Sequence, residues 1–309
     1  MGLNEAGFPR IRQFWRLSIS IVGIILMMGC AALPNTSTES AEQATTDHSP
    51  TAAPTQTPTP QPTPDGYCDT AGTITSMQFD SALLSKELIF QVYLPPCYDS
   101  QREQGYPFAV LLHGQNQDEN LWIDIGALDV ADAIILSGES TPFIMVFPRE
   151  EAFFRNSWES QYPFAIVEEL VPWIEENYHT CDEKTCRAIG GISRGANWAM
   201  RLGLANYDLF GSVGAHSLPT FPTDIRDLPT LLDKLPTGEE PRITIDVGRF
   251  DPGVSPAYRY EQVLNENGIP HSWHLNVGKH DQEYWRSQVE AYLRWYAAGW
   301  PNEMPPAGR

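Results

Sequence analysis

Arg187-Ala-Ile-Gly-Gly-Ile-Ser-Arg-Gly195 is the stretch of this sequence that says most about its fold. It contains a G-x-S-x-G pentapeptide centred on Ser193, which follows an apolar run and precedes a helical pattern at 196–205. A strand, a sharp turn that carries serine and a helix form the context in which this motif presents a nucleophile. The N-terminal N–H groups of such a helix point at the serine. Because Ser between glycines also occurs in ordinary turns, the motif needs an acid and a base elsewhere in the chain.

The rest of the chain alternates between two kinds of hydrophobic pattern. Runs rich in β-branched and aromatic residues predict strands at 73–79, 87–94, 106–112, 142–148, 186–192, 210–215, 242–248 and 271–277. Helical spacing predicts helices at 165–178, 196–205, 256–267 and 282–298. Strands that alternate with helices imply an α/β fold, a doubly wound and mostly parallel sheet with helices on both faces. We assign this domain to residues 66–300, followed by a tail at 301–309.

A base and an acid can be assigned from their positions after expected strands. A serine hydroxyl needs a base to take its proton, and the base, usually His, needs a carboxylate to orient it. In sheets of this kind the chain order is Ser, then the acid, then His. Asp251 and His280 each follow a separate strand in that order, whereas the rival Asp246 falls inside a strand, as a buried or edge polar residue would. We predict Ser193, Asp251 and His280 as nucleophile, acid and base.

Acyl transfer also needs hydrogen-bond donors for the oxyanion of the tetrahedral intermediate. The backbone N–H of Arg194, directly after the serine, is the first candidate. The second is expected in the loop after the strand at 106–112. We assign it to the N–H of Gln115, with Gly114 as the alternative, and expect His113 to orient the loop.

Substrate contacts are only weakly encoded. Trp122, Phe153, Phe154, Trp158 and Phe221 could line an apolar or aromatic cleft. Each is equally compatible with a place in the core. Trp122 and Trp158 are kept as the candidate substrate-binding residues.

These motifs resemble the esterase family of α/β-hydrolases, which includes feruloyl and acetylxylan esterases, S-formylglutathione hydrolase and the mycolyltransferases. The resemblance rests on Val92-Tyr-Leu-Pro-Pro96, Leu112-His-Gly114 with Trp122, Tyr178-His-Thr180, the stretch 187–195 and His280-Asp-Gln-Glu-Tyr-Trp285. It implies the α/β-hydrolase fold and an acyl-enzyme on Ser193, without metal or cofactor. It also places a cap or binding loop at 217–241. The chain departs from the family at Ala196-Asn197, where Gly is usual, and at Cys97.

The leading hypothesis is therefore a serine carboxylic-ester hydrolase that acts on a small or polysaccharide-linked ester, with acylated carbohydrates and feruloyl esters as candidate substrates. A cell-envelope acyltransferase, similar to the mycolyltransferases, is one alternative. A surface binding protein that keeps the fold without turnover is the other. A monomer is expected in each case.

The N-terminal residues carry the features of an export signal. Residues 1–29 combine a basic start with an apolar core too short to span a bilayer. Leu26-Met-Met-Gly-Cys30 resembles the bacterial lipobox, so we predict a lipoprotein signal peptide and lipidation of Cys30. Ordinary signal cleavage and an uncleaved anchor are the alternatives. Residues 30–65 are rich in Thr and Pro and predict a disordered linker. This organisation predicts an extracytoplasmic domain, lipid-anchored to a bacterial membrane.

Charge and cysteine content agree with export. The formal net charge of −19 and the lack of a basic cluster beyond the first residues argue against a nucleic-acid partner. We expect membrane contact only through the lipid anchor. With Cys30 set aside for lipid, four of the five cysteines remain, an even number typical of oxidising compartments.

Three pairings of these four cysteines are possible. Cys181 and Cys186 flank a short turn, and Cys68 and Cys97 flank two neighbouring expected strands. We predict the disulfides Cys68–Cys97 and Cys181–Cys186. A zinc site is the alternative, but it requires closely spaced ligand pairs, which Cys68 and Cys97 lack.

Overall fold

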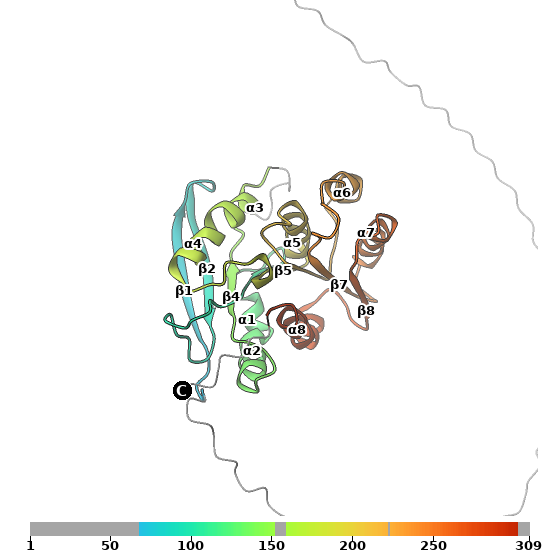
Figure 1. Ribbon diagram of the computed structural model, residues 1–309. Coiled ribbons are helices and arrows are strands. Elements are labelled where there is room, and N and C mark those ends of the chain that lie inside the picture. The colour runs from blue at the N-terminus through green and yellow to red at the C-terminus, as the bar shows by residue number, and fades with distance from the viewer. Residues whose placement is uncertain (1–67, 152–158, 222, 302–309) are drawn as a thin grey trace, which may run out of the picture. The chain divides into compact units, whose positions relative to one another are not determined.

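An eight-stranded sheet runs through the protein in the order β1-β2-β4-β3-β5-β6-β7-β8 (Figure 1). The structure is a computed structural model that describes residues 68–151, 159–221 and 223–301. Its strands are β1 (Thr73–Ser81), β2 (Lys86–Leu94), β3 (Phe108–Leu112), β4 (Ile144–Pro148), β5 (Arg187–Ile192), β6 (Ser212–His216), β7 (Arg242–Gly248) and β8 (Ser272–Asn276). β1 and β2 run antiparallel to their neighbours, and β3 to β8 are all parallel. The predicted mostly parallel sheet is confirmed.

The helices mostly follow the strands that they connect. They are α1 (Leu121–Asp124), α2 (Ala127–Leu136), α3 (Tyr162–Ala165), α4 (Val171–Asn177), α5 (Arg194–Ala205), α6 (Asp224–Leu232), α7 (Val254–Glu266) and α8 (Gln282–Ala297). A π-helical turn, η1 (Ile166–Leu170), joins α3 to α4 where one continuous helix is predicted, and a short 3-10 turn, η2 (Lys184–Cys186), precedes β5. The segment 217–241 contains α6, for which the sequence predicts no helix.

Helices cover both faces of the sheet, as predicted. α4, α5, α6 and α7 lie on one face, and α1, α2 and α8 lie on the other (Figure 1). The packing of strand β3 on both faces explains why its sequence is continuously apolar. Phe108, Val110 and Leu112 belong to the core of the first face, and Ala109 and Leu111 belong to that of the second. Because every side chain of a central parallel strand is buried, the strand carries no polar alternation.

The parallel strands bring distant segments together at one edge of the sheet. Loops that follow β3, β4, β5, β7 and β8 carry Gly114, Glu150, Ser193, Asp251 and His280, in that order. In open α/β sheets this carboxyl edge is where ligands bind. The topology therefore collects Glu150 and the four predicted site residues at one place.

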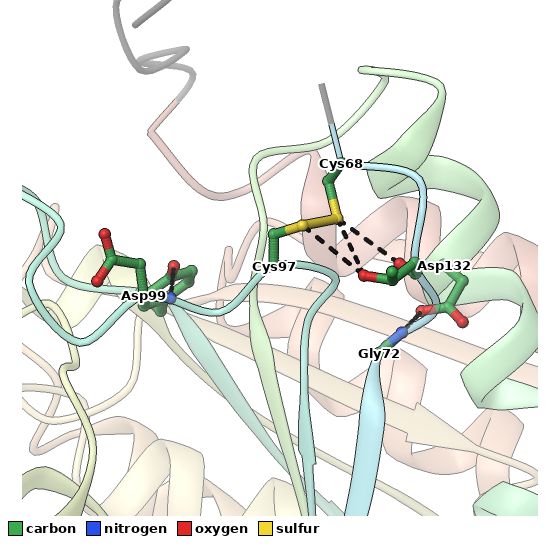
Figure 2. The surroundings of a disulfide bond; sticks show 7 residues. Cys68, Gly72, Cys97, Asp99 and Asp132 are labelled. Atoms are coloured by element: carbon green, nitrogen blue, oxygen red, sulfur yellow. Dashed lines mark hydrogen bonds between the residues drawn. A yellow bond between two sulfur atoms is a disulfide. The ribbon is translucent and has the colours of Figure 1, made fainter. Parts of the chain in front are cut away.

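Both predicted disulfides are present. Cys68–Cys97 ties the segment before β1 to the loop after β2, beside Gly72, whose N–H donates to Asp132 of α2 at 2.9 Å (Figure 2). Cys181–Cys186 closes the turn before β5. Cysteines joined in disulfides have no thiolate to give to a metal, so the zinc alternative is wrong for these four.

Several predictions fall on residues outside the described ranges. These are the signal peptide, Cys30, the linker, Phe153, Phe154, Trp158 and residues 302–309 of the tail. Within the described ranges, no helix combines the length and apolar character needed to cross a membrane.

Candidate active site

Ser193 lies on the sharp turn between β5 and α5. Its φ of 56° and ψ of −120° are unusual for a residue with a side chain. Strain of this kind persists only where the surroundings enforce it. A Cβ on Gly191 would come within 2.3 Å of the carbonyl carbon of Gly195, and one on Gly195 would come within 2.5 Å of the Leu112 carbonyl oxygen. Both glycines are therefore required for the turn, as the G-x-S-x-G motif implies.

The three predicted catalytic side chains are joined by two hydrogen bonds, from Ser193 to His280 and from His280 to Asp251, and we call this arrangement the row. The Oγ of Ser193 lies 2.8 Å from Nε2 of His280, and Nδ1 of His280 lies 2.7 Å from Oδ2 of Asp251. A carboxylate can only accept, so Nδ1 carries the proton and Nε2 is the acceptor for the serine hydroxyl. The row therefore has the hydrogen-bonding order of a serine, a base and an orienting acid.

The acid and the histidine differ in how far their side chains are buried. The Asp251 side chain is fully buried, whereas that of His280 is 29% exposed. The second Asp251 oxygen accepts the N–H of Gly253 at 2.6 Å, which fixes the carboxylate plane. The acid is thus held rigidly, and the imidazole remains within reach of a bound molecule.

The loop that carries His280 is held on both sides. Asp281 caps α8 by accepting the N–H of Tyr284 at 3.0 Å. The rings of Trp285 and His280 are nearly perpendicular, with centroids 5.4 Å apart, and Trp285 Nε1 donates to Ser217 Oγ at 2.9 Å. The imidazole is therefore positioned by a helix start and by a buried aromatic side chain.

The backbone N–H groups predicted as oxyanion donors belong to Arg194, directly after the serine, and to Gln115, directly after Gly114. Arg194 begins α5, and N–H groups in the first turn of a helix point out of its N-terminal end. The loop after β3 passes directly against the serine, because a Cβ on Gly114 would lie 3.2 Å from the Cβ of Ser193. Gln115, the next residue, is exposed. The candidate donors thus belong to two separate segments, the start of α5 and the loop after β3, that meet at the serine.

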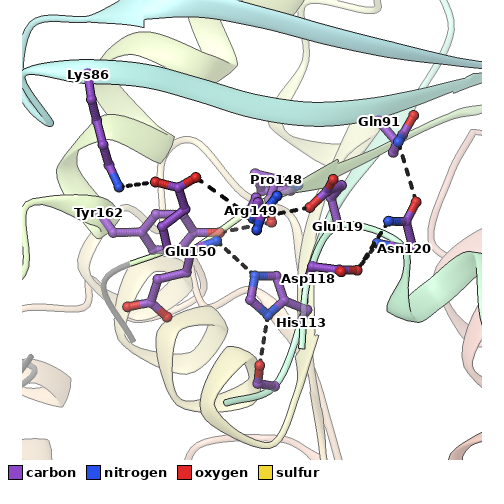
Figure 3. A network of polar contacts seen from close by, with 12 residues as sticks. Lys86, Gln91, His113, Asp118, Glu119, Asn120, Pro148, Arg149, Glu150 and Tyr162 are labelled. Atoms are coloured by element: carbon purple, nitrogen blue, oxygen red, sulfur yellow. Dashed lines mark hydrogen bonds and ion pairs between the residues drawn. The ribbon is translucent and has the colours of Figure 1, made fainter. Parts of the chain in front are cut away.

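Polar contacts of Glu150 support both of these segments, and Figure 3 shows the one that joins Glu150 to His113. The Glu150 carboxylate receives Nε and Nη2 of Arg194 at 2.8 and 2.7 Å. The N–H of Glu150 donates to Nε2 of His113 at 2.8 Å. His113 contacts the loop as expected, but the sequence offers no sign of Glu150, which stands in a run of charged residues that resembles a solvated surface.

Asp246, the other candidate for the acid, forms its hydrogen bonds with different side chains. It accepts Nδ1 of His216 at 2.7 Å and the hydroxyls of Tyr284 and Tyr292 at 2.6 and 2.8 Å. Burial, together with the Asp246 charge, raises the pKa of both tyrosines above its ordinary value. Asp246 is thus a structural carboxylate inside the protein, as its place within a strand indicates.

The expectation that Trp122 binds substrate is wrong. Its side chain is 1% exposed and packs in the core of the α8 face, where its Nε1 donates to the Leu112 carbonyl at 3.2 Å. Phe221, in contrast, is half-buried and packs against Trp198 and over the Arg194 guanidinium, beside the nucleophile turn. An apolar sequence context is typical both of a tryptophan in a core and of one in a substrate cleft, so only the fold distinguishes the two positions.

Among the described residues, no group of three His, Cys, Asp or Glu side chains is arranged to hold a metal ion.

The fold defines the class of this protein as an α/β-hydrolase, with Ser193 on the sharp turn between β5 and α5. Residues 81–296 match the family described as "Putative esterase", and the chain belongs to that family.

Individual relatives agree with this assignment. An endo-1,4-beta-xylanase/feruloyl esterase of Xylanibacter ruminicola is 29% identical over 171 residues, which cover 50% of this chain and 23% of that protein. The match thus spans about a quarter of that relative's length.

Solved structures share the fold. A ferulic acid esterase has a TM-score of 0.66 at 22% identity, covering 74% of this chain and 99% of its own. The S-formylglutathione hydrolase of Staphylococcus aureus has a TM-score of 0.63 at 16% identity, covering 75% and 100%.

Proposed function

We propose that the protein is an extracytoplasmic serine carboxylic-ester hydrolase that works through an acyl-enzyme on Ser193. The observation that carries this proposal is the row of two hydrogen bonds from Ser193 through His280 to Asp251. Family membership supports the same reaction class.

In the first half-reaction, Ser193 Oγ attacks the ester carbonyl carbon while its proton passes to Nε2 of His280. The carbonyl oxygen becomes an oxyanion, which receives hydrogen bonds from the N–H groups of Arg194 and Gln115. The tetrahedral intermediate then expels the alcohol, which takes the proton from His280. Asp251 holds the imidazole in the required tautomer and stabilises its charged form.

In the second half-reaction, water replaces the alcohol. His280 accepts a proton from water, the oxygen of which attacks the acyl carbon of the ester on Ser193. The second tetrahedral intermediate collapses, Oγ recovers its proton from His280, and the free carboxylic acid leaves. Each step uses the same base and the same donors, so no cofactor is needed for the balance of atoms.

The acyl group is proposed by analogy with the relatives. A feruloyl esterase among the curated relatives and a ferulic acid esterase of the same fold support an aromatic acyl group carried on a carbohydrate. Phe221 is half-buried beside the turn that carries Ser193, and we propose that its ring contacts such a group.

The location is supported by the two disulfides, since such bonds persist in oxidising compartments. Lipidation of Cys30, within the lipobox-like segment, would tether the domain to the membrane surface, and the Thr/Pro-rich segment would act as a spacer.

The test is a panel of acetyl, feruloyl and longer acyl esters, assayed with the wild-type protein and with Ser193→Ala. We expect hydrolysis of at least one ester class and its loss in the variant, with the circular dichroism spectrum unchanged. Turnover that survives in Ser193→Ala would overturn the proposal. Acyl transfer to an added sugar in place of hydrolysis would replace it with the acyltransferase alternative.

A further inference from the structure

We propose that Glu150 is a positioning residue that holds both halves of the oxyanion hole. This inference rests on the proposed function, because it assigns the oxyanion donors to the N–H groups of Arg194 and Gln115. Glu150 follows β4 and contacts both loops, one through its side chain and the other through its backbone. Among the described residues its hydrogen bonds go to His113, Arg194 and Trp198 and not to Ser193 or His280, so it would act through its neighbours.

The first contact fixes Arg194. The guanidinium donates two hydrogen bonds to the two Glu150 oxygens, at 2.8 and 2.7 Å, in the paired geometry that Arg and a carboxylate favour. Trp198, one turn further along α5, donates Nε1 to the same carboxylate at 3.0 Å. Glu150 and Arg194 are only 3% and 7% exposed. Residue 194 is therefore anchored through its side chain, and its backbone N–H is held with it.

The second contact fixes the loop after β3. Because Nε2 of His113 accepts the Glu150 N–H, the ring proton must lie on Nδ1, which donates to the Gly114 carbonyl at 2.7 Å. Burial lowers the pKa of His113, which favours this neutral form. The Gly114 carbonyl also accepts the N–H of Gln117, at 3.3 Å.

Peptide geometry carries this restraint to the second donor. The carbonyl of Gly114 and the N–H of Gln115 belong to one planar trans peptide, so they point in opposite directions. Two donors that hold the carbonyl therefore also set the direction of the N–H. Glu150 thus fixes Gln115 through His113 and fixes Arg194 directly. Oxyanion donors act through preorganisation, so this shared support matters for the transition state more than for substrate binding.

Glu150→Gln tests the side-chain contact with Arg194 and leaves the backbone contact with His113 in place. The variant keeps the size of the side chain and the backbone N–H, but it removes the charge and faces Arg194 with an amide. Glu175→Gln is the matched control, because Glu175 of α4 accepts Nε of Arg187 at 2.6 Å at the start of β5, the end opposite Ser193. All rates are expressed per active site titrated with a fluorophosphonate, so that unfolded protein does not count.

For Glu150→Gln we expect kcat to fall about 10- to 100-fold with KM nearly unchanged, as for a misplaced preorganised donor. The inhibition constant of an aryl trifluoromethyl ketone, which mimics the oxyanion, should rise by a similar factor. Glu175→Gln should lower Tm without changing either quantity. A purely structural role for Glu150 would likewise lower Tm and leave both quantities unchanged.

An unchanged kcat per titrated site in Glu150→Gln overturns the inference, while the proposed function stands as long as Ser193→Ala is inactive. His113→Leu tests the second contact, and it also serves if Glu150→Gln does not fold, since Leu cannot accept the Glu150 N–H or hold the Gly114 carbonyl. It should show the same loss in kcat and in inhibitor affinity. Normal values of both in this variant would also overturn the inference.

Discussion

Asp251 and His280 lie on loops that follow two neighbouring parallel strands, β7 and β8, and Nδ1 of the imidazole donates to the buried carboxylate at 2.7 Å. The hydrogen bond decides which nitrogen of the ring carries the proton. It therefore makes Nε2, the nitrogen that faces Ser193, an acceptor. The role of His280 as the proposed base thus depends on a contact between side chains from two separate loops.

Asp251→Asn should preserve the packing of this pair but lose the tautomer control. An amide that donates its N–H to Nδ1 leaves the proton on Nε2, where it cannot accept from the serine. We expect kcat to fall by about 10³- to 10⁴-fold. Steady-state kinetics on an aryl ester measure the loss. The control is Asp227→Asn, which alters an exposed ion pair with Arg226 and should leave kcat unchanged. A fall of less than about tenfold for Asp251→Asn would exclude this role.

Asp246→Ala should weaken the fold more than the chemistry. The substitution leaves the His216 Nδ1–H and the hydroxyls of Tyr284 and Tyr292 without their buried acceptor. Because buried donors without partners cost about 1–3 kcal/mol each, we expect a loss of at least about 3 kcal/mol in the free energy of unfolding. Urea denaturation measures it. If the loss is below about 1 kcal/mol, the network does not stabilise the protein.

The stability that His113 provides should depend on pH. Burial lowers its pKa from 6.5, so the folded state binds this proton less readily than the unfolded state. The contribution of His113 is therefore complete above about pH 6.5 and is lost as the pH falls toward the folded pKa. We expect the difference in unfolding free energy between wild type and His113→Leu to narrow between about pH 7.5 and about pH 5.5. A difference that grows on acidification would contradict the neutral, accepting imidazole.

The two disulfides should contribute unequally. They join residues 29 and 5 positions apart, and a cross-link restricts the unfolded chain more when its loop is longer. Loop entropy gives about 3.5 kcal/mol for Cys68–Cys97 and about 2 kcal/mol for Cys181–Cys186. Denaturant unfolding of the paired Cys→Ala variants compares them. A larger loss on removal of Cys181–Cys186 would show that native-state contacts, and not loop length, set the order.

The sequence predicted the fold and the residues that form the Ser193–His280–Asp251 arrangement because both follow from local patterns. Apolar runs of strand length marked β3 and β5, and position after a strand separated Asp251 from Asp246. The same reasoning paired the cysteines, since the partners flank adjacent elements. Each of these features is decided by what lies next to a residue along the chain.

The features that the sequence did not predict depend on contacts between distant segments. Glu150 stands between Arg149 and Glu151, and a run of charged residues indicates a surface until the fold places its middle member against Arg194. Trp122 is an aromatic residue whose core position depends on α8 packing over it. Helix α6 carries Pro229 in its interior, and proline in that position argues against a helix when judged from sequence alone.

The central claim is that Ser193 is the nucleophile, and covalent labelling tests it most directly. The protein is treated with a fluorophosphonate, its intact mass is measured, and the modified residue is located by peptide mapping. We expect a single adduct on Ser193 that forms in parallel with the loss of esterase activity and is absent in Ser193→Ala. Ester hydrolysis that persists without an adduct on Ser193, or inactivation through a different residue, would contradict it.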